Sequence, residues 1–214
     1  MAVIQRLAII INQHLNGKSL MQDFWFYIKL GLGHVLDFGA YDHILFLTAL
    51  AVPFTFRQWR PVLLLTTAFT IAHCSSLALS VYGVFVMDVG LIEFLIPMTI
   101  ILTALFNIIY QKSLREHKSL ILHLIATIFF GLIHGFGFSN YFKLLMAEEE
   151  AVLSSLLGFA TGIELSQLLI VLTVLALAYC CQSILKIKQP HFTIVASILI
   201  VLLTIPMLIA TFPF

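Results

Sequence analysis

Charged residues are scarce in this chain of 214 residues. Lys, Arg, Asp and Glu together make up 10% of it, whereas 61% is hydrophobic, and the mean hydropathy is +1.09. A soluble domain carries about 25% charged residues, so this chain has too few polar groups to cover a globule in water. The composition therefore predicts an integral membrane protein whose main solvent is lipid.

Further shortages exclude other classes of protein. The three cysteines, Cys74, Cys180 and Cys181, are an odd set without paired spacing, so they do not form a disulfide framework. The net charge is +1 and no basic stripe with interleaved aromatic residues is present, so nucleic acid is not an expected partner. The metal-binding motif HExxH is also missing, so a metal site would have to be assembled from separate helices.

Apolar runs bounded by charges, proline or glycine predict an all-α polytopic membrane bundle of six to seven transmembrane helices, in one domain over residues 1–214. Residues 1–20 have a short apolar core without a cleavage site, which predicts a retained amphipathic segment. The run near 21–38 is interrupted by Lys29, His34 and two glycines, so it is either a full span or a broken, partly re-entrant one. The expected spans lie near 21–38, 41–56, 61–83, 89–110, 119–138, 151–181 and 192–211.

The loops alternate in charge. Basic clusters begin at Arg57, Lys112 and Lys186, and the loops between them hold Asp88 and then Lys143 with the run Glu148 to Glu150. The positive-inside rule places the basic loops in the cytoplasm and predicts that the C-terminus lies outside.

With this orientation, five helices each bring ionisable residues to the outer half of the bilayer. These residues are Asp42 with His43, then His73, Glu93, His134 and Glu164. Ionisable side chains in a membrane seldom face lipid and usually turn inward toward one another. Imidazole and carboxylate are ligands for nickel, cobalt, zinc, copper or iron, so the convergence predicts a transition-metal site without naming the metal.

Several of these residues have simpler interpretations. Asp42 also suits the N-cap of a helix, and His34 is either a ligand or a hydrogen-bonding residue at a helix end. His123 and His191, near the inner side, are expected to be interfacial or hydrogen-bonded. A cluster of glycines at Gly131, Gly135 and Gly137 would allow close approach of a neighbouring helix.

Five short blocks carry a family resemblance. GHVLDFGAYDHILFL, FTIAHCSSLALS, IEFLIPMTI, FGLIHGFGFSNYF and GIELSQLL resemble, in order, the blocks of the HupE/UreJ family of bacterial membrane proteins, between about Phe26 and Leu169. The family is regarded as nickel or cobalt permeases, which implies a multi-pass protein of the bacterial inner membrane. The resemblance also implies a set of metal-contacting residues: His34, Asp42, His43, His73, His134 and Glu164.

Three functions are compatible with the sequence. The first is a nickel- or cobalt-type permease, in which only His123 and Asn107 offer polar groups toward the cytoplasm. The second is an intramembrane zinc-dependent hydrolase, similar in residue types to ceramidases and adiponectin receptors. In it His43, His73 and His134 would hold zinc, and Asp42 or Glu164 would act as the general base.

The third is a structural or sensory protein whose polar cluster fixes helix packing. The expected partners are the lipid bilayer and a divalent transition metal ion (Ni, Co, Zn or Cu), and homo-oligomers are compatible with the sequence.

Overall fold

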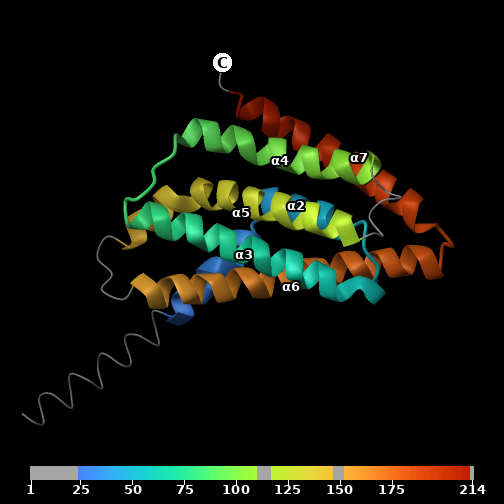
Figure 1. Ribbon diagram of the computed structural model, residues 1–214, viewed down its shortest axis with the longest axis horizontal. Helices are drawn as coiled ribbons and strands as arrows, with labels where there is room; N and C mark the ends of the chain where they lie inside the picture. Colours follow the sequence, from blue (N-terminus) through green and yellow to red (C-terminus); the bar gives the residue numbers. More distant parts are fainter. Residues whose placement is uncertain (1–23, 110–116, 147–151, 213–214) are drawn as a thin grey trace, which may run out of the picture.

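A computed structural model of the protein describes residues 24–109, 117–146 and 152–212, whose regular structure is entirely helical (Figure 1). The amphipathic segment expected over residues 1–20 lies outside this range. Within these described ranges, five helices are long and apolar enough to cross a membrane. They are α3 (Trp59–Val81), α4 (Val89–Ile109), α5 (His117–Met146), α6 (Val152–Ser183) and α7 (Gln189–Ala210), and a short 3-10 turn, η1 (Phe56–Gln58), precedes α3. The predicted all-α, polytopic fold is confirmed.

The first two expected spans differ from the prediction. The run near 21–38 is helical over residues 24–35, and the run near 41–56 forms only α2 (Asp42–Ala51). A helix of ten residues is about 15 Å long, half the thickness of a bilayer's hydrocarbon core. The separate second span expected over 41–56 is therefore shorter than predicted.

The helix of residues 24–35 and α2 together make one interrupted passage through the bundle. The first runs beside the start of α6, so closely that a Cβ on Gly162 would lie 2.1 Å from the carbonyl oxygen of Ile28. α2 continues toward the opposite end of the bundle, where Gln189 Nε2 donates a hydrogen bond to the carbonyl of Val52. Whether the first segment is a full span or a broken, partly re-entrant one stays a prediction, and its described part is helical over residues 24–35.

One end of the bundle carries a cluster of basic residues. This end, called the Arg57 end below, carries Arg57, Arg60, Lys186 and Lys188. There the ring centre of Phe56, in η1 just before α3, lies 6.1 Å from that of Tyr179 near the end of α6. The start of α3 and the end of α6 therefore lie together. The other end, called the Asp88 end, holds the start of α4 and the end of α7, where the rings of Phe94 and Phe212 lie 5.6 Å apart.

Helix packing places α2 and α5 between the pair α4–α7 and the pair α3–α6 (Figure 1). α3 and α5 run parallel in backbone contact, because Gly131 faces Phe69 and Gly135 faces His73. A Cβ on Gly135 would lie 2.2 Å from the carbonyl oxygen of His73. The predicted role of the glycine cluster is therefore confirmed, and the close approach brings two histidine-bearing helices together.

Candidate metal centre

Three histidines from separate elements meet in the middle of the bundle. His34 comes from the last turn of the helix of residues 24–35, His43 from the first turn of α2, and His73 from α3. One ring nitrogen of each lies within 4.8 Å of those of the other two. His43 and His73 are buried, with 2% and 0% of their surfaces exposed.

The break between the two half-helices creates this meeting. His34 lies where the first half-helix ends, and the last carbonyl groups of a helix carry partial negative charge that favours a cation. Broken helices in transporters present their ends to ions in the same way. Asp42 and His43 begin α2 on the other side of the break, so residues 36–41 bring both half-helices to one point.

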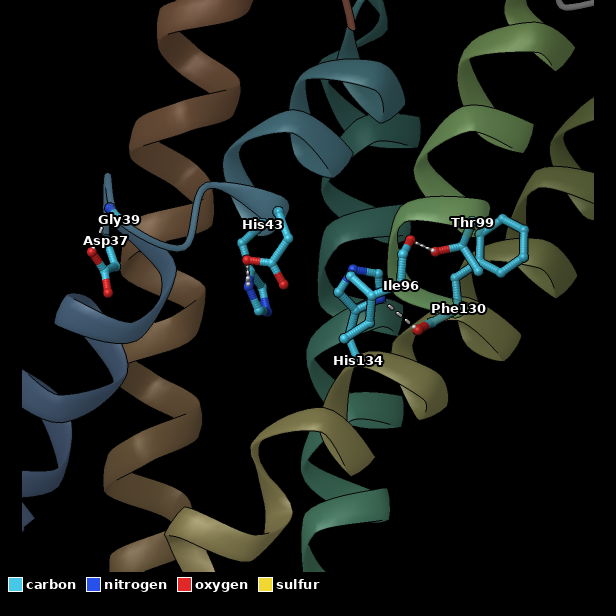
Figure 2. A network of polar contacts seen from close by, with 8 residues as sticks. Asp37, Gly39, His43, Ile96, Thr99, Phe130 and His134 are labelled. Atoms are coloured by element: carbon cyan, nitrogen blue, oxygen red, sulfur yellow. Dashed lines mark hydrogen bonds and ion pairs between the residues drawn. The ribbon is translucent and has the colours of Figure 1, made fainter. Parts of the chain in front are cut away.

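His134 and Asp42 extend the group and orient its rings; the contact of His134 with Phe130 is drawn in Figure 2. The ring centre of His134 lies 5.3 Å from that of His43, and its Nδ1 is 2.9 Å from the carbonyl oxygen of Phe130. Nδ1 of His43 lies 3.3 Å from Oδ1 of Asp42. In each neutral ring the nitrogen facing an oxygen carries the hydrogen, so Nε2 keeps the lone pair that a metal needs.

Five buried ring nitrogens of this group lack partners in the part of the chain that the structure describes. Nε2 of His34, His43 and His134 and both nitrogens of His73 are buried there without a hydrogen bond. Buried polar atoms normally have a partner, and orphaned ones call for an explanation. A set of converging imidazole lone pairs fits a transition-metal ion.

Aromatic side chains pack around the histidine group, a name used here for His34, His43, His73 and His134. The ring centre of Phe138 lies 4.0 Å from that of His34, and Phe69 lies 5.3 Å from His134. Phe159 contacts both His34 and His73. These rings pack against the imidazoles and limit their rotation.

A cavity of about 370 Å³ connects the histidine group with the Asp88 end. Three carboxylates, those of Asp37, Asp42 and Glu93, line it with the imidazoles of His34, His43 and His134, and its described lining includes no Lys or Arg. Residues near the end of α7, such as Thr211, complete the wall. A cavity walled by acidic groups and surrounded by apolar helices attracts cations.

Comparison with known families now adds to this geometry. Residues 11–211 match the family profile described as HupE / UreJ protein, which covers nearly the whole chain. The chain belongs to the HupE/UreJ family. Neither the curated proteins nor the solved structures contain a match.

In this HupE/UreJ protein, Asp42 is not the N-cap of α2. Tyr41 occupies that position and no side chain caps the helix, so the capping interpretation of Asp42 was wrong. Asp42 lies in the first turn instead, where its charge suits the helix dipole and where it reaches His43.

Glu164 lies away from the three-histidine group. Its two carboxylate oxygens accept hydrogen bonds from Thr67 and Thr70 of α3, each 2.6 Å long. The group of nearest ligand atoms contains His34, His43 and His73 and does not include it. Its role as a metal ligand stays a prediction, as do those of the other five candidates, His34, Asp42, His43, His73 and His134.

Sequence reasoning missed two parts of the site. Asp37 is not among the predicted site residues, although it lines the cavity and its carboxylate accepts a hydrogen bond from the Gly39 N–H (Figure 2). The aromatic residues around the histidines were also missed, because a phenylalanine in a membrane segment is ordinarily lipid-facing or core. The signal for Asp37 was its position inside the polar break between two apolar runs.

Proposed function

We propose that this HupE/UreJ protein is a permease for a divalent transition metal ion of the nickel or cobalt type. The family is associated with nickel and cobalt transport, and the described helices are those of a multi-pass membrane protein. We further propose that it lies in a bacterial inner membrane with the Arg57 end in the cytoplasm, following the positive-inside rule. The C-terminus would then lie outside.

The observation that carries this proposal is the group of His34, His43 and His73, of which His34 and His43 also line a cavity with three carboxylates in its wall. A hydrated cation would be drawn in by the carboxylates of Asp37, Asp42 and Glu93. It would then exchange water for imidazole nitrogens. Metal–nitrogen bonds of about 2.0–2.1 Å would bring the nitrogens closer than the present limit of 4.8 Å, so the rings would move inward on binding.

A zinc-dependent hydrolase is the second candidate, because three histidines beside a carboxylate leave a fourth position on zinc open for water. In such an enzyme the metal is resident and is not released. A permease must instead release it at the Arg57 end.

Purified protein distinguishes these functions. Elemental analysis and nickel titration measure metal binding, and uptake of radiolabelled nickel, cobalt or zinc into proteoliposomes measures transport. The permease proposal expects saturable uptake that His43→Ala and His73→Ala abolish, whereas His191→Ala, on an exposed position of α7, leaves it unchanged. Stoichiometric metal without uptake would overturn the permease and favour the hydrolase, and absence of both would overturn both metal functions.

A further inference from the structure

A second cavity lies in series with the first along the same three helices. It has a volume of about 240 Å³ and is lined by residues of α2, α4 and α5. On each helix, the residues that line the second cavity lie nearer the Arg57 end than those that line the first. On α2 the lining residue is His43 in the first cavity and Phe46 in the second, and on α5 it is His134 and then Phe130. On α4 the lining passes from Pro97 to Thr103.

The two cavities are separated by about one helical turn. Phe46 and Phe130, which line the second cavity, are three and four residues from His43 and His134, so they lie about 5 Å further along their helices. The ring of Phe46 lies 5.1 Å from that of His134 and 6.2 Å from that of Phe130. A thin aromatic barrier therefore divides the histidine group from the second cavity.

The second cavity holds three groups that can bind a metal. They are the imidazole of His123 and the hydroxyls of Thr103 and Thr127, all at least nine-tenths buried. His123 is held by the ring of Phe106, whose centre lies 4.8 Å away. The rest of the lining is apolar, so this donor set is much poorer than the histidine group.

We propose that His123, Thr103 and Thr127 form a second metal-contacting site, which a metal ion reaches from the histidine group by passing Phe46 and Phe130. The inference rests on the proposed permease function and deepens it by naming the release half of the route. One imidazole and two hydroxyl oxygens bind nickel or cobalt more weakly than several imidazoles do. Ion conduction needs such weaker sites, because an ion must leave as well as enter.

The test compares binding with uptake for Ni²⁺ in proteoliposomes. His123→Leu should bind one equivalent of Ni²⁺ with wild-type affinity, because the histidine group lies beyond the barrier, yet its initial uptake rate should fall by about tenfold or more. His123→Asn, which restores an oxygen ligand, should recover part of the rate. The matched control His191→Leu changes an exposed histidine near the Arg57 end and should transport normally.

The outcomes separate the two proposals. If wild-type protein moves Ni²⁺ and His123→Leu moves it equally fast, the second site is refuted while the permease stands. Loss of binding together with uptake in His123→Leu would also refute the second site, since His123 would then act on the histidine group. If the wild type neither binds nor moves Ni²⁺, the permease proposal fails and the second site falls with it.

Discussion

Replacing Gly135 with alanine should weaken metal binding without changing a ligand. The new Cβ would lie 1.9 Å from Ser76 Oγ and 2.2 Å from the carbonyl oxygen of His73. An unstrained contact between carbon and a carbonyl oxygen is about 3.3 Å or longer. Because that oxygen belongs to the backbone of α3, it cannot rotate away, and α5 must move off α3 by about 1 Å.

The magnitude follows from this displacement. Overpacking of this kind costs about 1–3 kcal/mol, which for a chain of this length lowers Tm by roughly 2–12 °C. His73 and His134 lie on the two separated helices, and metal–ligand distances tolerate changes of only about 0.2 Å. Metal affinity should therefore fall by about 10–100-fold, as it does when groups that support a metal ligand are lost.

The assay is a nickel titration by calorimetry together with thermal unfolding, both in detergent. Gly33→Ala is the matched control, because it adds the same methyl group next to His34 where no atom lies within 4 Å. This control should bind nickel like the wild type and unfold at the same or a slightly higher temperature. If Gly135→Ala binds nickel with wild-type affinity, the spacing of α3 and α5 does not set the site and the reasoning is refuted.

Three further predictions use other contacts. Asp42→Asn removes the charge that faces His43, so nickel affinity measured by calorimetry should fall by about tenfold with little change in Tm; an unchanged affinity would contradict this. Asn107→Leu leaves the carbonyl of Ala49 without its donor, and thermal unfolding should show a loss of about 1–3 kcal/mol, whereas no loss would mean that water replaces the amide. Nickel at about 100 times its Kd should stabilise the folded protein by about 2.7 kcal/mol, and a chelator should reverse this gain. A Tm that does not change on addition of nickel would contradict the proposed metal site.

Much of the fold follows from the apolar pattern of the sequence. Long apolar runs such as Val89–Ile109 and Gln189–Ala210 form the helices expected from them, with ends that shift by a few residues. The run near 21–38, interrupted by Lys29 and His34, is compatible with a full span or a broken one. Apolar length alone makes 41–56 resemble a full span, although Pro53 has no N–H with which to continue the helix and α2 ends at Ala51.

The site was predicted less evenly than the fold. Depth in the membrane follows from position along a helix, so the convergence of His43 and His73 could be anticipated. The rotation of each helix about its own axis could not be predicted, because it depends on how all the neighbouring helices pack. Glu164 lies on the side of α6 that faces the α3 threonines Thr67 and Thr70, and nothing in the local sequence distinguishes that side from the one facing the histidines.

The most direct test of the account is the metal content of the purified, full-length protein after equilibration with nickel. The account predicts about one tightly bound equivalent in the wild type, and little or none in His43→Ala, whose ring lies among those of His34, His73 and His134. Equal nickel content in the wild type and in a well-folded His43→Ala protein would contradict the central claim, because the metal would then be held elsewhere.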